Sequence, residues 1–227
     1  MYGEDETNFN LRYVLVLIHA LIIVIVAWIY FGGGIVLIGN VFNIQITEGN
    51  YLRLTILFSF SLVYFVRILF TLFSFLKRRM DWKEMVTVAF GLAVYHIGFA
   101  LTGAAQTAPI DILDVIPIFL FILGSYFNTG SEYQRKKFKA KPENKGKLYT
   151  EGLFRYSQHM NYFGDFLWIL GFALMTRNFW AFIMPLFCFI SFVFVNIPML
   201  NTYLKEKYKE QFEEWNKRTK KFIPFIY

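Results

Sequence analysis

The segment Gly152-Leu-Phe-Arg-Tyr-Ser-Gln-His-Met-Asn-Tyr-Phe-Gly-Asp165 runs directly into the apolar stretch Phe166-Leu-Trp-Ile-Leu-Gly-Phe-Ala-Leu-Met175. The first part is a dense polar cluster, and the second is apolar enough to enter a bilayer. Ionisable side chains at membrane depth usually face a bundle interior or a wet cavity, and they mark functional sites. Asn161, Asp165 and Trp168 are spaced i, i+4, i+7, so a helix places them on one face. That face is a candidate ligand wall.

The composition indicates a membrane protein. Of the 227 residues, 56% are hydrophobic and 17% are charged, whereas soluble domains carry about 25% charged residues. Several apolar runs reach the roughly 20 residues that a helix needs to cross about 30 Å of hydrocarbon. The sequence therefore predicts an all-α, polytopic membrane helix bundle.

Six transmembrane spans can be drawn along the chain, over residues 12–30, 52–76, 84–104, 112–128, 160–175 and 178–199. The apolar stretch Ile35–Ile46 is too short to cross alone, so it either extends the first span or lies re-entrant. The tail Tyr203–Arg218 mixes aromatic and charged residues near helical spacing, which predicts an amphipathic helix. Ile223–Tyr227 is expected to fold back as an apolar anchor. The expected fold is about six to seven transmembrane helices plus the C-terminal amphipathic helix.

The net charge of +7 lies in loops between apolar runs. Basic residues gather at Lys77–Lys83, Arg135–Arg155 and Lys205–Lys221, while the loop Gly103–Asp114 has no Lys or Arg. The positive-inside rule and attraction to anionic headgroups explain this distribution, so we expect contact with membrane lipids and no nucleic acid. The basic loops and both termini are predicted to be cytoplasmic. The acidic start, Met1–Thr7, lacks the basic region of a cleaved signal peptide, so the first span is expected to be retained.

Three polar groups are expected to converge on the cytoplasmic side. Asn128, Glu132 and Arg135 are spaced i, i+4, i+7 where the fourth span leaves the membrane. The members of the other two groups are Tyr156, His159, Asn161, Tyr162 and Asp165, and Asn196, Asn201 and Tyr203. Amide and carboxylate groups suit a ribose or adenine, and Lys and Arg suit phosphates. Together with aromatic faces, these residues predict a nucleotide-type cofactor site in a helix bundle.

Several of these residues also have a purely structural interpretation. His159 can cap the fifth span, and Asn161 and Asp165 can form an interhelical hydrogen-bonded pair. His19 and His96 stand alone in apolar runs, where packing or an interhelical hydrogen bond is expected. With three His and one Cys in the chain, a metal site has little support.

The C-terminal half resembles a known family. The block Gly146–Asp165, together with Phe119–Gly124, Asn128–Glu132 and the ending Phe222–Tyr227, is similar to the C-terminal domain of the steroid 5-alpha-reductase family, which is DUF1295-like. The similarity covers about residues 115–227, and its specificity lies in the combination of blocks. It implies a membrane oxidoreductase that uses NADPH to saturate a polarised carbon–carbon double bond of a lipid-soluble, steroid- or enone-like substrate.

The resemblance also implies roles for parts of the chain. Residues 1–110 would form the substrate side and residues 111–227 the cofactor side. The matches to residues that help to hold the dinucleotide are Asn128, Glu132, Asn161, Asp165 and Tyr203, and the matches to phosphate-binding positions are Arg135 and Lys147.

Tyr64-Phe-Val-Arg67 resembles the segment whose tyrosine hydrogen-bonds the substrate carbonyl, which implies Tyr64 as a catalytic proton donor or electrophile. Arg67 is a cation well inside the second span and needs a partner there. The steroid enzymes pair that tyrosine with a glutamate of an early span, for which Glu48 is a loose match. The exit of the last span, which is His-rich in the family, is Asn196-Ile-Pro-Met-Leu-Asn201 here.

Two other hypotheses stay open. The related isoprenylcysteine carboxyl methyltransferases share this architecture and an Arg-His-Pro-x-Tyr-x-Gly block, which here is Gln158-His-Met-Asn-Tyr-Phe-Gly164. His159 and Tyr162 would then help to hold S-adenosylmethionine beside an acidic or thiol methyl acceptor. The third hypothesis is a non-catalytic membrane protein that kept the fold and binds a lipid. Binding of NADPH or of S-adenosylmethionine separates the three, and the oligomeric state stays open.

Overall fold

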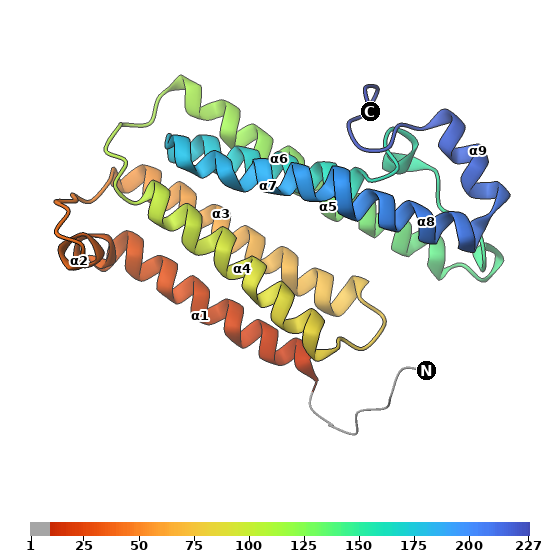
Figure 1. Ribbon diagram of the computed structural model, residues 1–227, viewed down its shortest axis with the longest axis horizontal. Coiled ribbons are helices and arrows are strands. Elements are labelled where there is room, and N and C mark those ends of the chain that lie inside the picture. The colour runs from red at the N-terminus through yellow and green to blue at the C-terminus, as the bar shows by residue number, and fades with distance from the viewer. Residues whose placement is uncertain (1–9) are drawn as a thin grey trace. The chain divides into compact units, whose positions relative to one another are not determined.

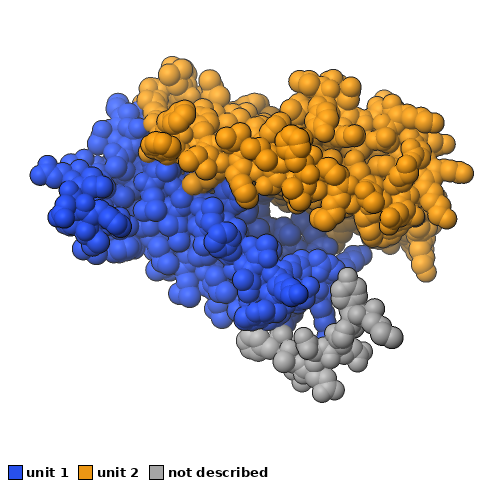
Figure 2. All heavy atoms as spheres, in the orientation of Figure 1, with its two compact units in different colours: residues 1–109 blue, residues 110–227 orange. Residues whose placement is uncertain are grey.

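The computed structural model describes residues 10–227 as helices joined by short loops (Figure 1). Within that range no β-strand occurs, which confirms the all-α fold. The acidic N-terminal segment of the sequence prediction lies outside the described residues. The chain divides between Pro109 and Ile110 into two compact units, which Figure 2 colours separately. The assignment of substrate and cofactor to the two halves stays a prediction.

The long helices of the first unit begin at side-chain caps, whereas its short helix does not. Asn50 accepts from the main-chain N–H of Arg53 at 3.1 Å, and Asp81 accepts from that of Glu84 at 2.8 Å. The helices of this unit are α1 (Leu11–Phe31), α2 (Gly34–Val41), α3 (Tyr51–Phe70), which continues in the π-helical turn η1 (Thr71–Phe75), and α4 (Trp82–Gly103).

The apolar stretch after α1 does not extend the first span. The chain turns at Gly33, whose φ of 74° is a conformation that favours glycine. The helix α2 that follows has eight residues, which is too short to cross the hydrocarbon. The first span therefore ends at Phe31.

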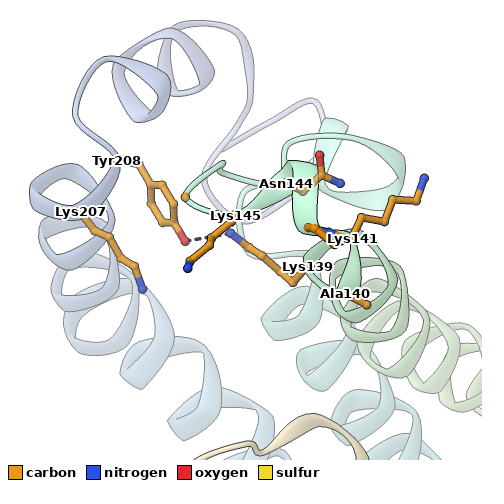
Figure 3. A pocket seen from close by; sticks show the side chains of 9 residues that line it. Lys139, Ala140, Lys141, Asn144, Lys145, Lys207 and Tyr208 are labelled. Atoms are coloured by element: carbon orange, nitrogen blue, oxygen red, sulfur yellow. Dashed lines mark hydrogen bonds between the residues drawn. The ribbon is translucent and has the colours of Figure 1, made fainter.

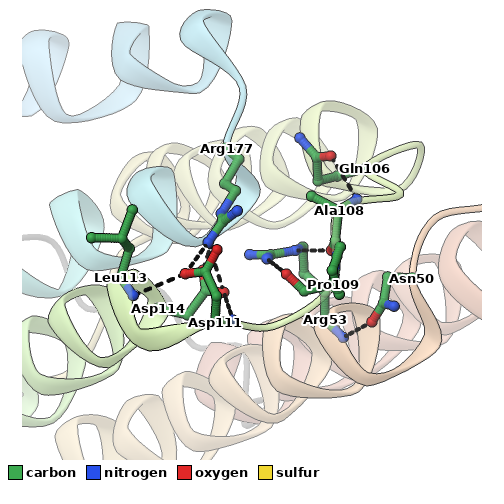
Figure 4. Close-up of polar contacts among 9 residues, drawn as sticks. All are labelled: Asn50, Arg53, Gln106, Ala108, Pro109, Asp111, Leu113, Asp114 and Arg177. Carbon is green, nitrogen blue, oxygen red and sulfur yellow. Dashed lines mark hydrogen bonds and ion pairs between the residues drawn. The ribbon is translucent and has the colours of Figure 1, made fainter.

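Arg53 ties α3 to the loop that closes the first unit (Figure 4). Its guanidinium donates to the carbonyl oxygens of Ala108 at 3.2 Å and Pro109 at 2.9 Å. The side chain is fully buried, and a buried cation is tolerated when its donors are used. This contact fixes the loop 104–109 against the start of α3.

The second unit is dominated by α5 and α6. Its helical elements are η2 (Ile112–Asp114), α5 (Val115–Ala140), η3 (Pro142–Asn144), η4 (Gly152–Arg155), α6 (Met160–Thr176), η5 (Phe179–Phe182), α7 (Ile183–Ser191), the π-helical turn η6 (Phe192–Asn196), α8 (Ile197–Tyr208) and α9 (Glu210–Arg218). The stretch from η5 to α8 runs as one helical segment.

Glycines let α5 and α6 pack backbone against backbone. A Cβ atom on Gly164 would lie 2.4 Å from the main-chain nitrogen of Asn128, and one on Gly124 would lie 2.4 Å from that of Trp168. Small residues allow this close approach between membrane helices. The contact brings Asn128 directly beside the residues that follow Gly164, and so it positions the polar cluster described below.

Among the described residues, five helical segments are long and apolar enough to cross a membrane: Leu11–Phe31, Tyr51–Phe75, Trp82–Gly103, Ile112–Ala140 and Phe179–Tyr208. With 17 residues, α6 lies at the lower limit for a span. The segments containing α5 and α8 run further than the predicted ends at 128 and 199. Lys and Glu continue both helices, and Gln and Arg also continue α5, because these residues are strong helix formers.

The predicted amphipathic tail Tyr203–Arg218 is helical, but it is divided between two helices. Lys209 has φ 46° and ψ −116°, outside the helical region, and it separates α8 from α9. Helix α9 is the predicted C-terminal amphipathic helix: it buries Phe212 and Trp215 in a cluster with Phe154 and Met160. Trp215 Nε1 also donates to the carbonyl oxygen of Phe154 at 3.2 Å.

The C-terminal end folds back on the segment that precedes α6. The Ser157 hydroxyl donates to the carbonyl oxygen of Phe222 at 2.7 Å, and the Gln158 N–H donates to that of Lys220 at 2.8 Å. The Phe222 side chain is fully buried, whereas Phe225 and Ile226, in the predicted apolar anchor, are exposed. Phe222 is therefore the residue that packs the end of the chain into the second unit.

Candidate cofactor site

A hydrogen-bonded cluster joins α5 to α6. The side-chain amide of Asn128 donates to Asp165 Oδ1 at 2.9 Å and to the carbonyl oxygen of Asn161 at 3.2 Å. The indole Nε1 of Trp168 donates to the same Asp165 oxygen at 2.8 Å. The interhelical partner of Asp165 is thus Asn128, while Asn161 lies on the same helix and contributes its main-chain carbonyl. The structure brings all three residues of the predicted α6 face into one cluster.

One face of α5 carries the first predicted polar group. Glu132 and Arg135 form an ion pair one turn beyond Asn128. Asp165 acts electrostatically on Glu132, and Arg135 acts on Tyr162. The charged residues of the stripe on α5 and of the cluster on α6 therefore lie close enough for their charges to interact.

His159 precedes α6 and links it to α8. The Nε2–H of its ring donates to Oδ1 of Asn201 at 2.8 Å, and the side chain makes no capping hydrogen bond to α6. The ring stacks on Tyr162 with centroids 5.4 Å apart, and Tyr162 stacks on Phe192 at 4.5 Å. Burial lowers the pKa of His159 to about 4; the bond to Asn201 opposes that shift and the positive charge of Arg135 adds to it. The imidazole is therefore neutral at pH 7.

A pocket of about 410 Å³ lies at the far end of α5 (Figure 3). Its polar lining, which we call the lysine pocket, consists of Lys139, Lys141, Asn144, Lys145, Lys207 and Tyr208. None of the described residues that line it is acidic. The ammonium group of Lys139 donates to the Tyr208 hydroxyl at 3.0 Å. Several cationic donors around one space, without a carboxylate, suit a phosphate group.

Two more predicted residues adjoin the lysine pocket, and one does not. The Tyr203 hydroxyl accepts from the ammonium of Lys207 at 2.7 Å. Lys147 accepts from a pocket lysine with its main-chain carbonyl, and its side chain is exposed. Tyr156 instead packs its ring against Phe225 near the C-terminus, with centroids 5.8 Å apart.

Helical spacing is sufficient to predict one further residue of the lysine pocket. Lys139 follows Asn128 by eleven residues, or about three helical turns, so it shares a face of α5 and lies about 16 Å further along the axis. Lys145, Lys207 and Tyr208 could not be found in this way. They come from a turn and from the end of α8, which only the fold brings to α5.

Tyr64, the predicted catalytic residue, lies on α3 in the first unit and is partly exposed. Its ring centroid is 5.4 Å from that of His96 and 6.0 Å from that of His19. The guanidinium of Arg67 lies 5.7 Å from the Tyr64 centroid. The Nε2 atoms of His19 and His96 are hydrogen-bonded at 2.7 Å, which confirms the interhelical contact expected for these two residues.

These features define an all-helical integral membrane protein with a polar site built on α5 and α6. A family model described as "Protein of unknown function (DUF1295)" matches residues 21–219. The chain therefore belongs to the DUF1295 family, and its resemblance to the steroid 5-alpha-reductases is confirmed.

Individual relatives match part of the chain. The 3-oxo-5-alpha-steroid 4-dehydrogenase 2 of Rattus norvegicus is 32% identical over 110 residues, which are 48% of this chain and 41% of the relative. The Homo sapiens enzyme of the same name is 31% identical over 117 residues, 52% of this chain and 44% of its own length. The Probable O-methyltransferase ustE of Ustilaginoidea virens is 34% identical over 90 residues, 39% and 31% respectively. Each match covers less than half of the relative.

Proposed function

We propose that the protein is an oxidoreductase that uses NADPH to reduce a polarised carbon–carbon double bond of a lipid-soluble, steroid- or enone-like substrate. The observation that carries this proposal is that the polar face of α5, which begins at Asn128, ends in the lysine pocket. The similarity to 3-oxo-5-alpha-steroid 4-dehydrogenase 2 supports the class of reaction. When bound, NADPH would supply the hydride.

The residues present fit a phosphorylated dinucleotide. The lysine pocket offers cationic donors for phosphate, and Asn128 and Asp165 offer amide and carboxylate groups for a ribose or base. The stacked rings of His159 and Tyr162 add an aromatic face. About 16 Å separates Asn128 from Lys139 along α5, and an extended dinucleotide spans a length of that order. The other residues proposed to hold the cofactor are Glu132, Arg135, Lys147, Tyr156, Asn161 and Tyr203.

Tyr64 is the proposed substrate-polarising residue of the first unit. Its phenol would donate a hydrogen bond to the substrate carbonyl and so draw electrons away from the double bond. Residues 1–110 would thus form the substrate side and 111–227 the cofactor side, with the cofactor entering from the cytoplasm.

One observation favours a second candidate. The similarity to Probable O-methyltransferase ustE supports a methyltransferase that uses S-adenosylmethionine. S-adenosylmethionine carries no phosphate, so the lysine pocket would have no part in binding it. For this reason we prefer NADPH; the third candidate is a non-catalytic protein that binds a lipid.

A thermal-shift titration of the detergent-purified protein with NADPH, NADH and S-adenosylmethionine separates these candidates. A cofactor that binds only the folded state raises the melting temperature. At a concentration of a hundred times its Kd it raises the free energy of unfolding by about 2.7 kcal/mol. Stabilisation by NADPH is the expected result. Stabilisation by S-adenosylmethionine alone would replace the reductase with the methyltransferase, and no shift with any cofactor would favour the non-catalytic protein.

Two substitutions at Asp165 test the cofactor wall. Asp165→Asn keeps an acceptor for Asn128 and Trp168 but removes the charge, whereas Asp165→Ala removes both. We expect NADPH stabilisation to be weakened by the first and lost with the second, because hydrogen bonds to charged groups are worth about 1.5–3 kcal/mol. Glu214→Gln, at an exposed carboxylate on α9, is the matched control. Wild-type affinity in Asp165→Ala would remove this residue from the site.

A further inference from the structure

Two buried imidazoles in the first unit have ring nitrogens that make no hydrogen bond. His19 on α1 is 0% exposed and His96 on α4 is 1% exposed. Their Nε2 atoms bond to each other at 2.7 Å, but neither Nδ1 atom has a hydrogen-bond partner among the described residues. A buried polar atom without a partner costs about 1–3 kcal/mol. A pair that served only to hold α1 against α4 would carry that cost at both ends.

The chemistry of the imidazole ring determines which of the two Nδ1 atoms carries a proton. Burial among apolar helices disfavours a charged ring, so both imidazoles are neutral. In a neutral pair joined by an Nε2–H···Nε2 bond, the donor ring has a bare Nδ1 and the acceptor ring carries its proton on Nδ1. The pair therefore presents one hydrogen-bond acceptor and one donor. When the shared proton crosses, and each Nδ1 gains or loses its own, the two ends exchange roles.

The pair lies directly behind the phenol proposed to polarise the substrate. Tyr64 is partly exposed, and its ring adjoins both buried imidazoles, with centroids 5.4 Å from His96 and 6.0 Å from His19. Phe65 covers His19 at 4.8 Å. The guanidinium of Arg67, 5.7 Å from the Tyr64 centroid, favours negative charge on the phenol oxygen. An imidazole pair that carries an Nδ1–H proton therefore packs against the ring of Tyr64.

We propose that His19 and His96 form a proton relay that reprotonates Tyr64. This inference rests on the proposed role of Tyr64 as a proton donor. After the phenol has given up its proton, the phenolate takes the Nδ1 proton of one imidazole through a bridging water. The shared proton crosses between the Nε2 atoms, and the other Nδ1 takes a proton from a water molecule, which leaves to the solvent as hydroxide. One proton passes from water to the phenolate, and no group is oxidised or reduced.

Nitrogen NMR of the histidine-labelled, detergent-solubilised full chain tests the relay without any turnover. The chain has three histidines, so His159→Gln leaves only the signals of the pair. We expect one ring protonated at Nδ1 and the other at Nε2, with the two arrangements in exchange. A pair that stays locked in one tautomeric arrangement would overturn the relay.

Substitution by glutamine separates a relay from a structural contact. The amide of His19→Gln or His96→Gln can still bond to the partner's Nε2, but it cannot pass a proton on. With NADPH and a steroid enone as the probe, we expect turnover to fall roughly 100-fold, the scale of general acid–base catalysis, with KM nearly unchanged. Tyr30→Phe is the matched control, because the Tyr30 hydroxyl also links α1 to α4 through the Phe99 carbonyl at 3.4 Å.

The two measurements keep the outcomes distinct. Exchanging tautomers together with wild-type turnover in both glutamine variants would overturn the role of the pair in catalysis. If the wild-type protein reduces no enone, the reductase proposal fails on that result, and the NMR experiment still decides whether the pair conducts a proton.

Discussion

The two ends of the α5–α6 pair treat charge in opposite ways. Where α5 begins, the Arg177 guanidinium lies between Asp111 at 2.6 Å and Asp114 at 3.0 Å (Figure 4). The same two carboxylates form a capping box on η2. Where α5 ends, four lysines line one pocket, and none of the described lining residues is acidic.

This difference separates a structural site from the proposed binding site. At the first end the charges neutralise one another, and the hydrogen bond from Arg177 holds the pKa of Asp111 below its usual value. At the second end like charges share a pocket, and an anion that enters it would lower the repulsion among them. Substitutions at the first end should therefore change stability, whereas substitutions at the second should change affinity.

The largest loss of stability is expected at the backbone contact between α5 and α6, which supports both ends of the pair. Gly164→Ala places a Cβ 2.4 Å from the main-chain nitrogen of Asn128 and 2.6 Å from the carbonyl oxygen of Gly124. Neither backbone can move away easily, so we expect a loss of about 3 kcal/mol in the free energy of unfolding, measured by denaturation in detergent. Gly130→Ala, on α5, meets its nearest atom at 3.5 Å and is the control. Equal melting of both variants would show that α5 and α6 are not held by this contact.

The pH dependence of stability tests the burial of His159. The pKa of His159 is about 4 in the folded state and about 6.5 when unfolded. As the pH falls from 6.5 to 4, only the unfolded chain takes up the proton, so stability is lost in that window, by about 3 kcal/mol. Unfolding midpoints measured from pH 7 to pH 4 check this, and His159→Gln should flatten the curve. An equally steep curve in that variant would assign the loss to other groups.

A smaller loss of stability is expected at the start of α5, where Arg177 neutralises two carboxylates. Asp114 is 2% exposed and accepts from both Arg177 and the main-chain N–H of Asp111. Asp114→Ala should therefore lower the free energy of unfolding by about 2 kcal/mol and leave NADPH affinity unchanged. Asp111→Ala, at a more exposed carboxylate, should cost less. A change of affinity in either variant would contradict the division between the two ends.

Sequence alone predicted those features that one helix contains. The apolar runs of α1, α3 and α4 are continuous patterns, so their ends fall within a few residues of the predicted spans. The polar stripe on α5 follows from helical spacing in the same way. The break at Lys209 could not be predicted, because no Gly or Pro marks it. The contact of His159 with Asn201 depends on long-range packing, which leaves no local pattern in the sequence.

The smallest expected effect is a change in NADPH affinity, and it tests the lysine pocket most selectively. Lys145→Gln removes one pocket cation, so we expect NADPH to bind roughly tenfold more weakly, as for the loss of one charge-assisted contact. Without cofactor, the melting temperature should stay the same or rise slightly, because repulsion among the lysines decreases. Added salt should weaken binding to the wild type more than to the variant.

Lys83→Gln, at an exposed lysine in the first unit, is the control in isothermal titration calorimetry. Unchanged affinity in Lys145→Gln would mean that the pocket's charge serves something other than the cofactor. A loss of stability without cofactor would mean that the lysines, like Arg177, are part of the structure. Weaker binding with unchanged stability is the only result that supports a structural role for one end of α5 and a binding role for the other.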